Sequence, residues 1–166
     1  MPSPVGHALG AIAVGWKIVP RPQWRAAAVL AMVAIAPDLD LLVRDHRGMS
    51  HSLGVAIIAG LVAWGIASAS AELRRDRLRW AIAVTLAWAS HVALDWLSND
   101  TRPPIGVMAL WPLSRGYYKA SIEIFPAISR HYWEARFWIY NTKALLVELL
   151  ILGPLAAALL WRRQPR

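Results

Sequence analysis

Residues 52–71, SLGVAIIAGLVAWGIASASA, contain no charged side chain over about the length that a helix needs to cross a bilayer core. Two further stretches, 78–97 and 144–161, are nearly as apolar. Of the 166 residues in the chain, 57% are hydrophobic and only 17% are charged, against about 25% in an average soluble domain. These features predict an all-α membrane protein with at least these three spans.

Two earlier apolar segments, 5–19 and 26–43, are interrupted by polar residues. Pro37 disfavours helical geometry at Ala36, so the second segment should break or kink there. We expect the two segments either to span fully or to form a short re-entrant hairpin. No basic stretch precedes the first segment and no clear cleavage site follows it, so we expect it to remain in the mature protein.

Basic residues gather in three regions that share one side of the membrane if the five segments alternate in direction. The positive-inside rule assigns this side to the cytoplasm and explains the net charge of +8 without nucleic acid as a partner. The opposite side then receives the loop 44–51 and the long connection 98–143. The basic residues are Lys17, Arg21, Arg25, Arg74, Arg75, Arg77, Arg79, Arg162, Arg163 and Arg166.

Ionisable residues converge on the extracytoplasmic ends of the predicted segments. His91 and Asp95 are four residues apart, which places both side chains on one face of a helix. An aspartate near hydrocarbon needs a cation, a metal or a water-filled cavity, although a simple hydrogen bond between these two side chains is an alternative. The convergent residues are His7, Asp38, Asp40, His51, His91 and Asp95.

Asp38 and Asp40 belong to the sequence PDLD, where an irregular turn after Pro37 allows both carboxylates to approach one centre. Two carboxylates held close resist ionisation unless a cation lies between them, but a capping turn at a helix end explains PDLD equally well. Because the chain lacks cysteine, a metal would have only nitrogen and oxygen ligands. This ligand set suits Zn²⁺, with Mn²⁺ or Fe²⁺ as alternatives, and one or two ions.

The loop before residues 52–71 adds further candidates. Ser50 and Ser52 are candidate helix caps, and the positive end of that helix should keep the imidazole of His51 neutral, the form that binds metal. His46 and Arg47 are either exposed loop residues or contacts for proton transfer and substrate. A guanidinium binds two phosphate oxygens at once, which makes Arg47 a candidate phosphate ligand.

The motifs PDLD, HRGMSHS, HVALD and WPLS (111–114) resemble those of the YdjM-like membrane-bound metal-dependent hydrolases, also described as LexA-binding, inner-membrane-associated hydrolases. That family is thought to be distantly related to zinc-dependent phospholipase C, so the resemblance implies hydrolysis of a phosphoester at the level of fold analogy. The resemblance points to the same convergent residues as metal ligands, with His46, Arg47 and Ser114 close by.

The connection 98–143 ends in HYWEARFWIYNTK, residues 131–143, which has the pattern of an amphipathic helix lying in the membrane interface. Arg115 and its neighbours are candidates for binding anionic headgroups, although an ordinary interfacial belt explains them as well. Glu148 lies one turn inside the last apolar segment, and we expect its side chain to extend back toward water.

The sequence therefore predicts one membrane-embedded hydrolase domain over residues 1–166, a multi-pass helical bundle of about five segments plus the interfacial helix. We expect metal-activated water at the extracytoplasmic face of the inner membrane to cleave a phosphoester of a lipid or amphiphile. Two rival hypotheses stay open: a non-catalytic docking protein with a structural metal or ion-pair cluster, and a cation transporter. The candidate catalytic residues are Asp40 and His46, and the candidate substrate contacts are Arg47, Ser114 and Arg115.

Overall fold

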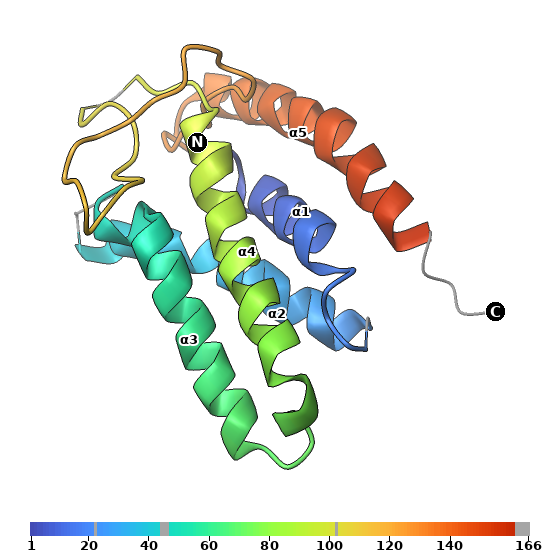
Figure 1. The fold of residues 1–166 in the computed structure, drawn as a ribbon. Coiled ribbons are helices and arrows are strands. Elements are labelled where there is room, and N and C mark those ends of the chain that lie inside the picture. The colour runs from blue at the N-terminus through green and yellow to red at the C-terminus, as the bar shows by residue number, and fades with distance from the viewer. Residues whose placement is uncertain (22, 44–46, 102, 162–166) are drawn as a thin grey trace.

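The computed structural model describes residues 1–21, 23–43, 47–101 and 103–161, and these form an all-helical fold. Helices α1 (Pro4–Gly15) and α2 (Trp24–Ile35) pack as one hairpin, and α3 (Leu53–Ala69) and α4 (Arg77–Trp96) pack as a second (Figure 1). The long α5 (Ala135–Trp161) lies against α1. Three short 3-10 helices complete the described elements: η1 (Ala36–Val43), η2 (Met49–His51) and η3 (Arg74–Asp76).

Helix length bears on which segments can cross a bilayer. Among the described helices, only α5 is both long and apolar enough, over Ala135–Leu159. α1 and α2 have 12 residues each, about 18 Å against a hydrocarbon core of about 30 Å, so both are short. α3 is apolar but has 17 residues. The all-α prediction is confirmed, whereas the multi-pass arrangement stays a prediction.

The interfacial helix predicted at residues 131–143 is wrong as a separate element. Residues 135–143 are the first turns of α5 and continue without a break into the apolar segment, while 131–134 form a turn before the helix. No glycine or proline occurs between Ala135 and Leu152, so the local sequence contains nothing that would end the helix there.

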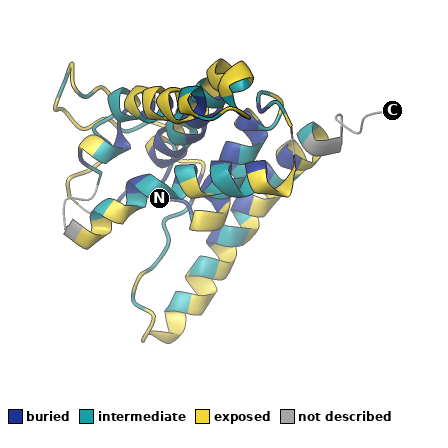
Figure 2. Cartoon of the chain, turned by 90° about the horizontal axis from the view of Figure 1, so that it is seen from below, coloured by how far each residue is buried: buried dark blue, intermediate teal, exposed yellow. Residues whose placement is uncertain are grey.

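Small side chains allow the helices to pack closely. At Gly60 of α3, a Cβ would collide with Thr85 of α4, so this glycine permits the close approach of the two helices. Figure 2 shows buried residues where helices face one another and exposed residues along their outer faces. The main buried cluster, between α1, α2 and α4, is rich in alanine, which lets helices approach closely. Its members are Ala11, Val19, Ala26, Leu30, Ala34, Ala83 and Ala87.

One end of the bundle is covered by the connection between α4 and α5 (Figure 1). α3 begins and α4 ends here, and the covering loop is tied down by backbone hydrogen bonds such as Leu53 N–H to the Ala109 carbonyl (2.9 Å). Ser52 caps α3 by accepting the N–H of Val55 (3.1 Å), as predicted. As also predicted, the segment changes at Pro37, where α2 gives way to η1. Ala36 nevertheless keeps helical dihedral angles (φ −56°, ψ −36°), so the prediction that Pro37 disfavours helical geometry there is wrong.

Glu148 of α5 is fully buried, so the prediction that it extends toward water is wrong. Its carboxylate accepts hydrogen bonds from the backbone N–H of Ser3 (2.7 Å) and from the Ser3 hydroxyl. The Ser3 hydroxyl in turn caps α1 by accepting the N–H of Gly6 (3.2 Å). The carboxylate therefore lies at the positive end of α1 and joins α5 to the helix that carries His7.

Replacing Glu148 with alanine is expected to lower the free energy of unfolding by about 1–3 kcal/mol, because the Ser3 donors lose their acceptor in a buried position. Thermal unfolding in detergent measures this loss. Glu148→Gln keeps a carbonyl acceptor and should retain part of the stability. Identical unfolding of the wild type and Glu148→Ala would contradict the capping role.

Candidate metal centre

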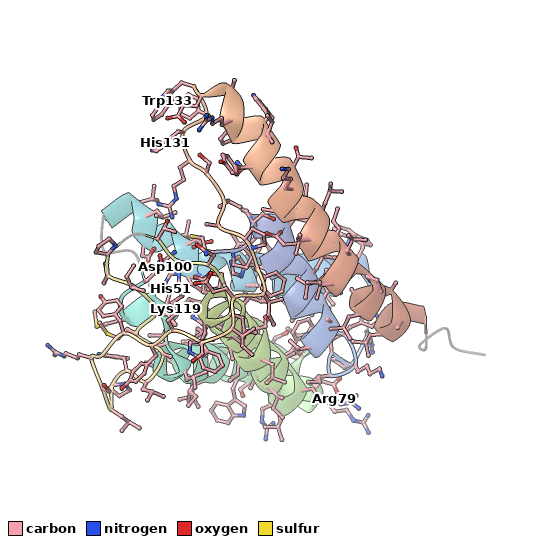
Figure 3. The ribbon with its side chains drawn as sticks, turned by 90° about the horizontal axis from the view of Figure 1, so that it is seen from above. His51, Arg79, Asp100, Lys119, His131 and Trp133 are labelled. Carbon is pink, nitrogen blue, oxygen red and sulfur yellow. The ribbon has the colours of Figure 1, made fainter. Side chains whose placement is uncertain are left out.

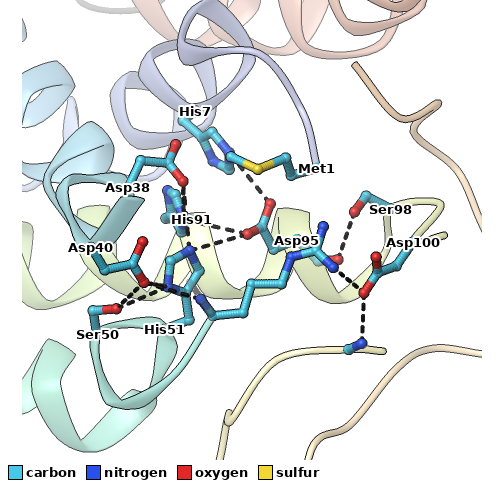
Figure 4. Close-up of polar contacts among 12 residues, drawn as sticks. Met1, His7, Asp38, Asp40, Ser50, His51, His91, Asp95, Ser98 and Asp100 are labelled. Carbon is cyan, nitrogen blue, oxygen red and sulfur yellow. Dashed lines mark hydrogen bonds and ion pairs between the residues drawn. The ribbon is translucent and has the colours of Figure 1, made fainter. Parts of the chain in front are cut away.

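Four side chains from three elements meet beneath the covering loop: Asp38 of η1, His51 of η2, and His91 and Asp95 of α4 (Figure 4). Each offers one ligand atom, and these atoms all lie within 4.8 Å of one another. The two histidines are fully buried and Asp95 is 4% exposed. We call these four residues the central cluster.

The four histidine–carboxylate distances within the central cluster are close to those expected around a small cation. His51 Nε2 lies 3.6 Å from Asp38 Oδ1 and 3.4 Å from Asp95 Oδ2. His91 Nε2 lies 3.8 Å and 3.5 Å from the same two oxygens. In a tetrahedral zinc centre with bonds of about 2.0–2.1 Å, ligand atoms are about 3.4 Å apart. The observed separations are close to this value and too long for good hydrogen bonds.

Several buried atoms of the cluster make no hydrogen bond to any residue that the structure describes. They are His91 Nε2, Asp38 Oδ1 and both carboxylate oxygens of Asp95. Burial of carboxylate oxygens without such partners is costly, and a cation among them would remove this cost. The central cluster therefore fits a divalent metal with nitrogen and oxygen ligands.

The outer nitrogens of the two histidines are held by acceptors. His91 Nδ1 lies 2.7 Å from the carbonyl oxygen of Ala34, and His51 Nδ1 lies 3.0 Å from Asp40 Oδ2. With a proton on each Nδ1, the lone pairs on both Nε2 atoms are directed toward the centre, which is the usual arrangement of metal-binding histidines. Asp40 Oδ2 also accepts the N–H of Arg47 (3.0 Å) and the Ser50 hydroxyl (2.6 Å). Asp40 thus orients His51 and lies outside the central cluster.

We expect Asp40→Ala to lower the metal affinity about 10–100-fold, because His51 Nδ1 loses its charged acceptor and keeps only the Ser50 hydroxyl, 3.0 Å away. Competition with a chromogenic chelator measures the affinity. Asp76→Ala, at the opposite end of α4, is the matched control and should leave the affinity unchanged. If the two variants behave alike, Asp40 does not orient a ligand.

His7 joins the central cluster from α1. Its ring stacks on that of His91, with centroids 3.8 Å apart and planes at 19°, and its Nε2 lies 3.5 Å from Asp95 Oδ1. His7 is fully buried, and neither ring nitrogen makes a hydrogen bond to a described residue. His7 is therefore available as a further ligand, beside the second oxygen of Asp95. The six residues that the sequence singled out do come together, with four at the centre, His7 beside them and Asp40 behind His51.

A family model described as YdjM inner membrane protein matches residues 1–165. The chain belongs to this family. Membership confirms the resemblance to the YdjM family and indicates an inner-membrane location, whereas the hydrolase activity that the resemblance implied stays a prediction. No curated protein and no solved structure matches the chain.

In this member of the YdjM family, the protonation of His51 differs from the prediction. Burial lowers the pKa of His51, but interactions with Asp38 and Asp40 and the charge of Asp95 outweigh burial and raise the pKa to about 9. The positive end of α3 does not keep the ring neutral, because three carboxylates with oxygens 3.0–3.6 Å from the ring nitrogens stabilise the protonated form more strongly. Before a metal binds, a proton on His51 thus supplies positive charge to the cluster.

Arg47 connects the cluster to a neighbouring cavity. Its backbone adopts a φ of 70°, which is uncommon for a residue other than glycine, and its guanidinium pairs with Asp100. Nε of Arg47 is buried and makes no hydrogen bond to a described residue. The guanidinium borders a cavity of about 230 Å³ that Met1, Asn99, Asp100 and Arg130 also line.

Ser114 and Arg115, the other predicted substrate contacts, lie in the connection between α4 and α5. The Ser114 hydroxyl accepts hydrogen bonds from Gly116 N–H (3.1 Å) and Tyr118 Oη–H (2.8 Å), and Arg115 is exposed. His46, like Arg162, Arg163 and Arg166, lies outside the described residues. Figure 3 shows His131 and Trp133 at the outer edge of the molecule, away from His51 and Asp100.

Asp100 is the residue that sequence reasoning missed. It is 8% exposed, pairs with Arg47 and accepts the N–H of Gly106 (2.7 Å), so it fixes the guanidinium beside the cavity. In the sequence it follows Asn99 in a polar turn after an apolar segment, which is the pattern of an ordinary loop. Nothing in that pattern distinguishes it from a solvent-exposed aspartate.

Proposed function

We propose that the protein is a membrane-embedded, metal-dependent hydrolase that cleaves a phosphoester of a lipid or amphiphile. The observation that carries the proposal is the convergence of buried nitrogen and oxygen atoms on one point, with the opposite side of each histidine already held. A divalent ion, most simply Zn²⁺, would lower the pKa of a bound water toward about 7 and polarise a phosphoryl oxygen. We place the helices in the inner membrane in a multi-pass arrangement, with the cluster at the extracytoplasmic face.

The exposure of the ligands indicates the side from which a substrate would approach. The Asp38 side chain is 11% exposed, whereas the side chains of His51, His91 and Asp95 are at most 1% exposed. Substrate would therefore reach the centre past Asp38 and η1. His7, on the other side of His91, either serves as a further ligand or moves a proton.

The cavity beside Arg47 supports an anionic substrate. Arg47 and Arg130 both line this cavity, and a guanidinium there would bind a phosphate oxygen. A volume of about 230 Å³ is below the roughly 300 Å³ at which pockets for drug-sized ligands begin, so it suits a single headgroup. In the reaction, a water oxygen bonds to phosphorus, the ester P–O bond breaks, and the departing alcohol takes up a proton.

The rival with an observation in its favour is a structural metal site. Three of the four central ligands are almost completely buried, as in a closed site, whereas a catalytic site keeps an open coordination position. The visible spectrum of the Co²⁺-loaded protein separates the two, because a small anion such as azide changes the spectrum only where a position is open.

The test of the proposal is hydrolysis by metal-loaded protein in nanodiscs. We expect Zn²⁺- or Mn²⁺-loaded protein to release phosphate or a phosphorylated headgroup from an anionic phospholipid, and Asp38→Asn to lose this activity. Glu134→Gln, an exposed carboxylate that pairs with His131 away from the cluster, is the control for protein quality. Fully loaded protein that hydrolyses none of a panel of lipid and soluble phosphoesters, with a spectrum insensitive to azide, would overturn the proposal in favour of the structural site.

A further inference from the structure

A long apolar groove runs between α2 and α3, with α4 as its floor. Its volume is about 870 Å³, and its walls include Val29 and Met32 of α2 and Ile58 and Val62 of α3. Several of these side chains are widely exposed, with Met32 at 64% and Val62 at 55%. The groove exists because α2 and α3 each pack on α4, which separates them.

The two ends of the groove differ in chemistry. Charged residues border one end, including Arg21 and Arg25 before and within α2 and Glu72 and Asp76 between α3 and α4. Ala36, Val55 and Trp88 border the other end. These three residues lie two to four positions from Asp38, His51 and His91 respectively, all of them central ligands.

Trp88 makes the junction between groove and cluster explicit. Its indole N–H donates to the carbonyl oxygen of Ser50 (2.8 Å), the residue before His51. Its ring therefore forms the end wall of an apolar channel on one side and fixes the ligand-bearing η2 on the other. A molecule that lies in the groove with a polar end at Trp88 has that end beside the central cluster.

The length of the groove matches one leaflet of a membrane. From Val55 to Ile66 of α3, the groove follows eleven residue steps, about 17 Å at 1.5 Å per residue. Half of a hydrocarbon core of about 30 Å is about 15 Å. A lipid chain in one leaflet could thus lie along the groove with its head at the end where the cluster is.

We propose that this groove holds the hydrocarbon chain of the substrate, whose phosphoester lies at the central cluster. The inference rests on the proposed function and names the substrate class as a membrane amphiphile bound by its chain. The family membership places the chain in an inner membrane, where lipid is the most abundant apolar ligand, and the continuity of groove and cluster gives this chain a defined orientation. Its methyl end points toward the charged end of the groove.

The test uses two photoreactive probes in phosphatidylglycerol vesicles. Each is a phosphatidic acid with a diazirine in its acyl chain, placed near the head in one probe and at the methyl end in the other. After illumination of the metal-loaded full-length protein, we expect the first probe to label residues near Val55 and Trp88, and the second to label residues near Ile66 and Trp80. Labels in the reverse order, labels confined to α5, or no label on α3 and α4 would each overturn the inference.

Matched variants of α3 give the second measurement. Ala59→Phe fills the groove, whereas Gly65→Phe adds the same ring where nothing lies within 4 Å and outside the groove lining. We expect labelling to fall about five-fold or more in Ala59→Phe and to stay unchanged in Gly65→Phe, with equal metal content in both. Equal labelling of the two variants would contradict the inference.

The two proposals can fail separately. Labelling does not depend on turnover, so groove labelling without hydrolysis of any phosphoester would overturn the proposed function alone. If Ala59→Phe lowers the hydrolysis of long-chain and of soluble phosphoesters to the same extent, the groove assignment alone would be overturned. If both proposals hold, Ala59→Phe loses activity on the long-chain substrate and retains it on the soluble one.

Discussion

Replacing Asp95 with asparagine is expected to lower the affinity of the protein for Zn²⁺ by more than about 100-fold, since loss of a mere supporting partner of a ligand typically costs 10–100-fold. Asp95 lies within 3.5 Å of three histidines. Its Oδ2 lies 3.4 Å from His51 Nε2 and 3.5 Å from His91 Nε2, and its Oδ1 lies 3.5 Å from His7 Nε2.

The physical reason is charge rather than shape. Asparagine has nearly the same size as aspartate, so the cluster should keep its packing, but the variant has one neutral oxygen where a carboxylate had offered two charged ones. A site with two carboxylates can neutralise a divalent ion, and the variant leaves only Asp38 within the central cluster to do so. Metal analysis after equilibrium dialysis, together with chelator competition, measures the loss.

Asp76→Asn is the matched control, because Asp76 lies at the opposite end of α4 and pairs there with Arg79 at 3.9 Å. It removes the same charge from the protein without touching the cluster, so it should bind Zn²⁺ as the wild type does. Equal Zn²⁺ content in Asp95→Asn, Asp76→Asn and the wild type would show that the central cluster is not a metal site.

Much of this site could be predicted because it depends on features that local sequence reports. The spacing of His91 and Asp95 fixes a shared helix face, and Pro37 fixes where α2 gives way to η1. Alternation of the segments then brings both of these stretches, with His7, to one end of the bundle. The convergence therefore follows from helix periodicity and chain direction alone.

What could not be predicted depends on contacts between distant segments. Asp40 resembles Asp38 in sequence, and only the path of η1 directs it to the outer nitrogen of His51 instead of the centre. From the sequence, the side chain of Glu148 is expected to extend toward water. Only the packing of α5 on α1 shows that Ser3 donates hydrogen bonds to its carboxylate. The paired charge of Asp100 and Arg47 likewise joins two loops that have no shared local pattern.

Removing the metal is expected to lower the midpoint of thermal unfolding by about 10 °C. A ligand present at 1,000 times its dissociation constant stabilises the folded state by about 4 kcal/mol, and in a chain of this length each kcal/mol shifts the midpoint by about 2–4 °C. The ion would join α1, η1, η2 and α4, which hold the cluster together in the fold. Unfolding in detergent with Zn²⁺, and after dialysis against a chelator, measures the shift.

The shift should be moderate because a protonated His51 replaces part of the positive charge of the metal in the chelated protein. His51, whose pKa is raised to about 9, carries a proton at neutral pH and offsets part of the charge of Asp38 and Asp95. The Asp95→Asn variant has one negative charge less in the cluster and should bind metal weakly. Its midpoint of thermal unfolding should therefore be nearly the same with and without chelator. A wild-type midpoint that does not respond to chelator, in protein shown by analysis to have lost its metal, would mean that the ion contributes to chemistry without supporting the fold.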